Sequence, residues 1–134
     1  MRPKRIILVL DADQDRAGTL RYLFETHGYV GLVAFTEKEV WAQLDDQWPD
    51  VIVSTLGFAG GEEPALFGKL WKLDGPRLLV LASTTSLQPK YPFNRVLYGA
   101  SSSEILECAH MLAQRKRGPR KGFQRNQKPA APAA

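Results

Sequence analysis

Two short apolar runs decide the fold: residues 6–13 read Ile-Ile-Leu-Val-Leu-Asp-Ala-Asp, and residues 49–55 read Pro-Asp-Val-Ile-Val-Ser-Thr. Neither run alternates between apolar and polar side chains, which is typical of a strand that is covered on both faces. The first run leads into acidic residues, whereas the second ends in Ser54 and Thr55. Both runs therefore predict buried strands, with different side-chain chemistry at their carboxyl ends.

The segments around these runs predict an alternation of strands and helices. We expect strands at 6–10, 29–34, 50–55, 78–81 and 95–98, and helices at 14–27, 37–46, from Pro64 to Trp71, and at 102–116. Thr36 with Glu39, and Ser101 with Glu104, have the spacing of capping boxes at two helix starts. This order predicts an α/β domain in which helices cover both faces of a parallel sheet.

The connection between the last two strands departs from this alternation. Residues 83–93 hold two prolines and little helical periodicity. We therefore expect the fourth helix of a regular alternation to be shortened or lost.

Composition indicates one globular domain with no disulfide. The chain has 134 residues, of which 44% are hydrophobic, and its single cysteine, Cys108, falls within a helical pattern that predicts burial. There is no secretory signal pattern, and no apolar run approaches the ~20 residues of a membrane span. We expect a cytoplasmic domain over residues 1–116.

Charge is distributed unevenly along the chain. All 14 acidic residues precede residue 108 and are accompanied by eleven basic ones, which gives this part a net charge of −3. The remaining seven basic residues are Arg115, Lys116, Arg117, Arg120, Lys121, Arg125 and Lys128. We expect residues 117–134, which are basic and rich in Pro and Ala, to be a disordered tail. Such a tail suits contact with nucleic acid, contact with an acidic protein or membrane surface, or no specific partner.

Four pieces of sequence together resemble a bacterial response-regulator receiver domain. They are Ile7-Leu8-Val9-Leu10-Asp11, Gly28-Tyr29, Pro49-Asp50-Val51-Ile52-Val53-Ser54 and Pro76-Arg77-Leu78-Leu79-Val80-Leu81. The resemblance covers about residues 4–116. It implies a flavodoxin-like, doubly wound, five-stranded parallel sheet with strand order 2-1-3-4-5.

The resemblance also implies where a phosphorylation site would lie. Receivers hold Mg²⁺ with two acids after the first strand and an acceptor aspartate on the third, while a hydroxyl and a lysine bind the phosphoryl group. The matching positions here are Asp11 and Ala12 (with Asp13 next), Thr55, Ala82 (with Ser83 next) and Tyr98. A rival alignment that matches Lys90-Tyr91-Pro92-Phe93 to the lysine region would leave no fifth strand before it.

These departures predict a pseudo-receiver. A threonine hydroxyl lacks the nucleophilicity of a carboxylate unless a base activates it, and it is a poorer ligand for Mg²⁺. We therefore expect no phosphorylation, no metal, no cofactor and no enzymatic activity. We expect Thr55 to hydrogen-bond to the backbone at its strand end.

The resulting functional hypothesis is a phosphorylation-independent protein-interaction module in bacterial signal transduction or localisation, as a monomer or weak dimer. The expected partner surface is Leu87, Lys90, Tyr91, Phe93 and Tyr98. The alternative is a nucleic-acid-binding accessory protein that uses the basic tail. An active receiver with Asp11 or Asp13 as acceptor is disfavoured, because these residues belong to the first strand's loop.

Overall fold

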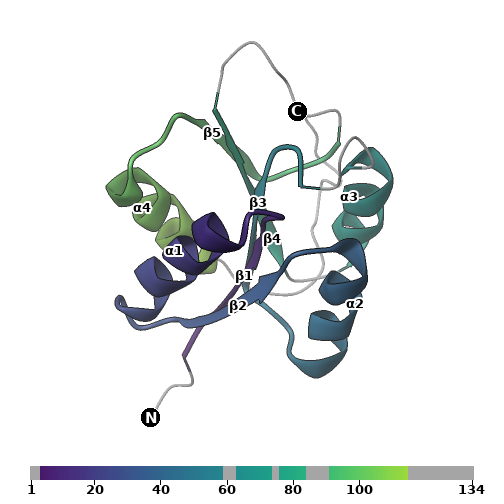
Figure 1. Ribbon diagram of the computed structural model, residues 1–134, viewed down its shortest axis with the longest axis horizontal. Helices are drawn as coiled ribbons and strands as arrows, with labels where there is room; N and C mark the ends of the chain where they lie inside the picture. The colour runs from purple at the N-terminus through teal and green to yellow at the C-terminus, as the bar shows by residue number, and fades with distance from the viewer. Residues whose placement is uncertain (1–3, 59–62, 74–75, 84–90, 115–134) are drawn as a thin grey trace.

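The computed structural model describes residues 4–58, 63–73, 76–83 and 91–114, in which strands and helices alternate as the sequence predicts (Figure 1). The strands are β1 (Ile6–Leu10), β2 (Val30–Ala34), β3 (Val51–Thr55), β4 (Arg77–Ala82) and β5 (Arg95–Tyr98). The helices are α1 (Gln14–Glu25), α2 (Glu37–Asp46), α3 (Glu63–Trp71) and α4 (Ser102–Ala113). The fifth strand lies at 95–98, so the rival alignment through residues 90–93 is not supported.

The five strands form one parallel sheet in the order β2-β1-β3-β4-β5. This confirms the predicted α/β class and the flavodoxin-like strand order. The chain builds outward from β1 to β2 and then returns to place β3 on the other side of β1. Such a reversal brings the carboxyl ends of β1 and β3 side by side, where ligand sites of open α/β sheets are usually found.

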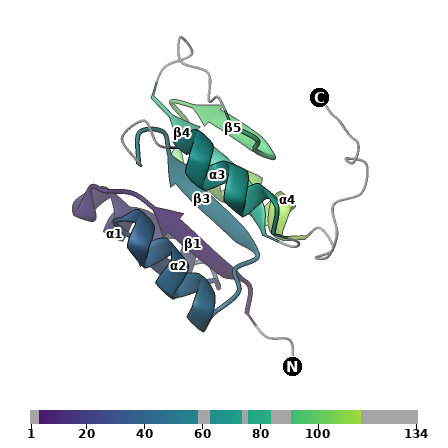
Figure 2. The same cartoon turned by 90° about the vertical axis from the view of Figure 1, so that its right-hand side faces the viewer.

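The core has two layers, because successive strand residues point to opposite faces of the sheet. On one face α1 and α4 cover Ile7 and Val9, and on the other α2 and α3 cover Leu8 and Leu10 (Figures 1 and 2). Cys108 is buried in the first layer, as predicted. Burial on both faces explains why the strand sequences do not alternate.

Two helices end earlier than predicted. α1 ends at Glu25: the N–H of Thr26 still donates to the carbonyl of Tyr22, four residues back, but the N–H groups of His27 and Tyr29 both donate to the carbonyl of Phe24. Gly28 then adopts a φ of 91°, a left-handed conformation that suits glycine and leads the chain into β2. The last helix ends at Ala113, and residues beyond 114 lie outside the described part of the chain.

The two capping boxes differ in geometry. At α4 both bonds form: the Glu104 N–H donates to Ser101 Oγ at 3.2 Å, and the Ser101 N–H donates to Glu104 Oε1 at 2.8 Å. At α2 the Glu39 N–H donates to Thr36 Oγ1 at 3.3 Å, but Glu39 Oε1 accepts from the Phe35 N–H at 2.7 Å. At α2 the glutamate side chain therefore bonds the N–H of Phe35, one residue before the N-cap Thr36, and not the N–H of the N-cap itself.

Some predictions concern residues outside the described ranges. Between β4 and β5 only residues 83 and 91–94 are described, and none of them is helical. Residues 84–90 of the expected shortened helix, and the expected tail at 117–134, lie outside the described ranges. In the described parts of the chain, no helix has the length and apolar character needed to cross a membrane.

Candidate functional site

The predicted site positions lie along one edge of the sheet, where its parallel strands end. Asp11 directly follows β1, and Thr55 is the last residue of β3. Ala82 and Tyr98 end β4 and β5 and are partners in the strand ladder. Of these four residues, Asp11, Thr55 and Ala82 are buried and Tyr98 is partly buried.

The Asp11 side chain is fully buried and is held by a guanidinium group. Arg16 Nε donates to Asp11 Oδ2 at 2.5 Å, and Arg16 Nη2 donates to Asp11 Oδ1 at 2.8 Å. The Asp13 N–H donates to the same Oδ1 at 3.0 Å. The hydrogen bond to Asp11 raises the pKa of the Arg16 guanidinium above its usual value. Both carboxylate oxygens of Asp11 are therefore engaged within the chain.

Asp13 is exposed and serves as the N-cap of α1. Its Oδ1 accepts from the Arg16 N–H at 3.1 Å, and its carbonyl accepts from the Ala17 N–H at 2.9 Å. Capping by aspartate satisfies helix N–H groups and complements the positive end of the helix dipole. Two other predicted site positions, Ala12 and Ser83, are also exposed.

Thr55 hydrogen-bonds to the backbone, as the sequence predicts. Its buried Oγ1 donates to the carbonyl oxygen of Leu10 at 3.3 Å, across the β1–β3 boundary. The neighbouring Ser54 hydroxyl donates to the Thr55 carbonyl at 3.2 Å. The Thr55 hydroxyl therefore links the end of β3 to β1, and the Ser54 hydroxyl bonds within β3.

The predicted partner surface is only partly described, because Leu87 and Lys90 lie outside the described ranges. Tyr91 is buried and stacks on Phe67 with a centroid separation of 4.5 Å, so its ring belongs to the core. Phe93 is partly buried and meets Tyr91 edge to face. Tyr98 is partly buried, and its solvent-shielded hydroxyl has no hydrogen-bond partner among the residues that the structure describes.

Sequence patterns did not bring Arg16 into this site. Within α1 it has the appearance of an ordinary exposed residue of the first turn, and its side chain is indeed 58% exposed. The sequence feature that could have indicated the pair is the spacing of five residues between Asp11 and Arg16. An aspartate that ends a buried strand requires a partner, and the first turn of the next helix is the nearest element to supply one.

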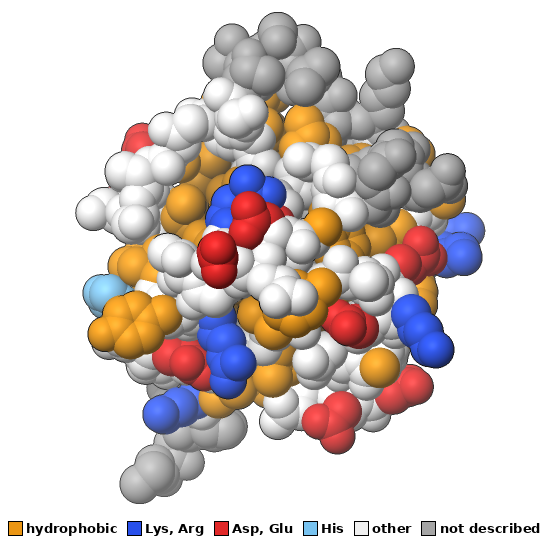
Figure 3. Space-filling view, viewed as in Figure 1, with side chains coloured by type: hydrophobic (Ala, Val, Ile, Leu, Met, Phe, Trp, Pro, Cys, Tyr) orange, Lys and Arg blue, Asp and Glu red, His pale blue; other side chains and the backbone are white. Residues whose placement is uncertain are grey.

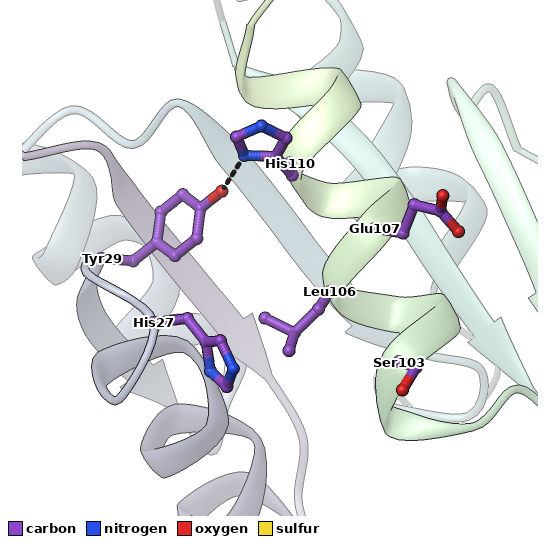
Figure 4. A pocket seen from close by; sticks show the side chains of 6 residues that line it. All are labelled: His27, Tyr29, Ser103, Leu106, Glu107 and His110. Atoms are coloured by element: carbon purple, nitrogen blue, oxygen red, sulfur yellow. Dashed lines mark hydrogen bonds between the residues drawn. The ribbon is translucent and has the colours of Figure 1, made fainter.

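A hollow lies between the end of α1, the start of β2 and α4 (Figure 4). It is an open groove of about 480 Å³ lined by His27, Tyr29, Ser103, Leu106, Glu107 and His110. The Tyr29 hydroxyl and His110 Nδ1 are hydrogen-bonded at 2.9 Å, which links β2 to α4. Burial raises the pKa of the Tyr29 phenol, and the charge of Arg5 opposes this rise.

The fold is similar to that of solved receiver domains. The receiver domain of Francisella response regulator 1452 superposes with a TM-score of 0.72 at 23% identity, covering 83% of this chain and 98% of that one. The CheY-like receiver domain from Methylobacillus flagellatus gives 0.71 at 14% identity, covering 82% and 99%. A response regulator receiver protein from Burkholderia phymatum gives 0.72 at 10% identity, covering 85% and 98%.

Comparison at the level of sequence adds no relative. No family model matches the chain, and no curated protein matches it. The structural neighbours therefore establish the fold, which is that of a CheY-like receiver domain, and the residues at its strand ends carry the functional argument.

Proposed function

We propose that this chain is a non-catalytic, receiver-like signalling module that acts through protein contacts and without phosphorylation. The receiver fold supports the signalling part of the proposal. The observation that carries the rest is Thr55 at the end of β3, whose hydroxyl donates to the Leu10 carbonyl. A nucleophilic hydroxyl must instead donate to a base that removes its proton.

Phosphorylation is tested directly by incubating the protein with acetyl phosphate and Mg²⁺ and measuring its intact mass. We expect no gain of a phosphoryl group, with an active receiver domain treated in parallel as the positive control. A beryllofluoride adduct, seen as NMR shift changes clustered around Asp11 and Thr55, would contradict the proposal.

We place the partner surface around the connection from β4 to β5, at Phe93 and Tyr98 together with Leu87 and Lys90. Tyr98 supports this placement, because it ends β5 and its partly buried side chain leaves surface that a partner can cover. Phe93 adds apolar surface next to the Tyr91 ring.

Affinity capture from native lysate with matched variants tests this surface. Tyr98→Ala and Phe93→Ala each remove a ring, so both are expected to capture less of a protein that the unaltered chain enriches. Tyr22→Ala, on the outer side of α1, is the control and should capture as much as the unaltered chain. Equal capture by all three variants would contradict this placement of the partner surface.

A second candidate function is nucleic-acid contact through the tail. Its basis is the seven positive charges at 115–128, against a net charge of −3 in the preceding residues. Figure 3 shows acidic side chains gathered over α2, a surface that would repel phosphates. We therefore propose that any nucleic-acid affinity resides in the tail and is independent of sequence.

Fluorescence anisotropy with a mixed single-stranded oligonucleotide tests this candidate across a range of salt concentrations. If all seven cations engage, affinity should fall with salt at a log–log slope of about −5. A full-length variant with these seven residues changed to serine should lose the affinity. Binding that survives in this variant would place nucleic-acid recognition on the residues before 115.

A further inference from the structure

The strongest unexplained feature is a charged group with no access to water. The side chain of Asp11 has no exposed surface, whereas the side chain of its partner Arg16 is 58% exposed. A buried carboxylate loses its hydration and is tolerated when a cation and hydrogen-bond donors replace the water. A compensating cation is therefore required at this end of β1.

Arg16 meets this requirement with two parallel hydrogen bonds to the two oxygens of Asp11. Such a bidentate pair is among the stronger charge-assisted contacts and also fixes the relative orientation of both groups. The Asp13 N–H adds a third donor to the same carboxylate. The loop between β1 and α1 is thereby closed around Asp11 by groups that all come from residues 13–16.

The same contacts decide whether a divalent cation fits at this edge. Mg²⁺ takes about six oxygen ligands in near-ideal octahedral geometry, usually including one or two carboxylates. Here the Asp11 oxygens face the guanidinium, the Asp13 carboxylate caps α1, and the Thr55 hydroxyl donates to Leu10. In the described residues, no three His, Cys, Asp or Glu side chains are grouped to hold a metal. The residues present therefore do not fit the Mg²⁺ that the receiver fold implies.

We propose that Arg16 is a built-in counter-ion that takes the place of a divalent cation at the carboxyl-terminal edge of the sheet. The loop between β1 and α1 is then held in one arrangement whether or not divalent cations are present. This inference does not depend on the proposed partner contacts, and it holds even if the partner surface lies elsewhere.

Thermal unfolding of the full chain with and without millimolar Mg²⁺ or Mn²⁺ tests the proposal. The unaltered protein should show the same Tm in all three conditions. Arg16→Gln should lower Tm by on the order of 10 °C in the absence of metal, because it leaves Asp11 buried without a cation. Mn²⁺ should restore part of this loss, since the Asp11 oxygens no longer face a guanidinium.

Two matched variants identify the cause of any shift. Arg21→Gln removes an exposed pair of Arg21 with Glu25 on the same helix and should lower Tm by only about 1–3 °C. The double variant Asp11→Asn with Arg16→Gln should lose the response to Mn²⁺, because a neutral amide then replaces the carboxylate at position 11. A Tm loss in Arg16→Gln no greater than in Arg21→Gln would overturn the proposal.

A measurement on the unaltered protein covers the case in which Arg16→Gln does not fold. Mn²⁺ broadens the NMR signals of nearby nuclei, so substoichiometric Mn²⁺ reports whether a metal reaches this edge. We expect the backbone signals of residues 11–16 to broaden no more in the unaltered protein than in Asp11→Asn, since the exposed carboxylates of Asp13 and Asp15 are present in both. Broadening that requires the Asp11 carboxylate would show that a metal displaces Arg16, which would overturn the proposal whatever the acetyl phosphate experiment shows.

Discussion

At the scale of single residues, the site is defined by what each polar group already binds. The Thr55 hydroxyl, the Asp11 carboxylate and the Asp13 carboxylate all have partners within the chain. We therefore expect that introducing a carboxylate at one position does not assemble a phosphorylation site, because the neighbouring groups stay engaged.

We predict that Thr55→Asp is destabilised by about 1–3 kcal/mol and does not become phosphorylated. The variant loses the bond to Leu10 and buries an acidic group next to a carbonyl. Urea unfolding gives the stability, and intact mass after acetyl phosphate treatment gives the modification. Thr55→Val keeps the shape and should lose only about 1 kcal/mol. Stable phosphorylation of Thr55→Asp would mean that Arg16 releases Asp11.

A second residue-scale prediction concerns alkaline pH and Tyr29. Its pKa in the folded protein lies above the ordinary value of 10.0, because burial disfavours the charged phenolate. A group with a raised folded pKa contributes stability below its unfolded pKa, and this contribution is lost as pH rises toward the folded pKa. We predict that the free energy of unfolding falls above about pH 10 and falls less steeply in Tyr29→Phe.

Urea unfolding at several pH values between about 8 and 11 measures this effect. Tyr29→Phe also loses the hydrogen bond to His110, which should lower stability by about 1 kcal/mol at neutral pH. Tyr22→Phe changes a ring that is 70% exposed and should keep the alkaline fall of the unaltered protein. An unchanged alkaline fall in Tyr29→Phe would contradict the assignment.

At the scale of elements, the packing of α1 against β2 depends on the absence of a side chain. A Cβ added at Gly31 of β2 would lie 2.9 Å from Arg21 Cγ and 3.2 Å from the Arg21 carbonyl oxygen. The backbone atom cannot move aside without shifting the helix. The distance between this helix and the sheet is therefore set by Gly31.

We predict that Gly31→Ala lowers the free energy of unfolding by about 1–3 kcal/mol, as overpacking usually does. Gly18→Ala, in the middle of α1, is the matched control because an added Cβ there has no atom within 4 Å. It should raise stability by about 0.5–1 kcal/mol through helix propensity. Equal effects of the two changes in urea unfolding would contradict this account of the contact.

Elements could be predicted from sequence because their signals are local. The uninterrupted run 6–10 indicated a buried strand, and Ser101 with Glu104 marked the start of α4. The pair of Asp11 with Arg16 was harder to predict, because its contact depends on the backbone conformation of the turn between β1 and α1. The bond from Tyr29 to His110 joins residues 81 positions apart, and no local pattern indicates it.

At the scale of the whole molecule, the net charge of the chain does not describe the charge of residues 1–114. The chain carries +4, but the residues before the basic cluster carry −3. Figure 3 shows acidic and basic side chains side by side over the start of α1, with acidic ones predominating over α2. Electrostatic behaviour should therefore change sign when the basic residues after 114 are removed.

We predict that a chain ending at Gly118 keeps the Tm of the full chain. Residues 119–134 contain one large apolar side chain, Phe123, which is too little to offset an ordering cost of about 1–2 kcal/mol per residue. Differential scanning calorimetry of both chains measures the difference. A fall of several degrees would mean that the removed residues pack against the domain.

The pairing of Asp11 with Arg16 also bears on the order of folding. Its partners are five positions apart, so contact requires only β1 and the first turn of α1, at a small loop-closure cost. A cation site assembled from the ends of separate strands exists only once distant segments such as Leu10 and Thr55, 45 positions apart, have met. Charge neutralisation in this chain can therefore precede sheet assembly, and refolding should proceed at the same rate with or without divalent cations.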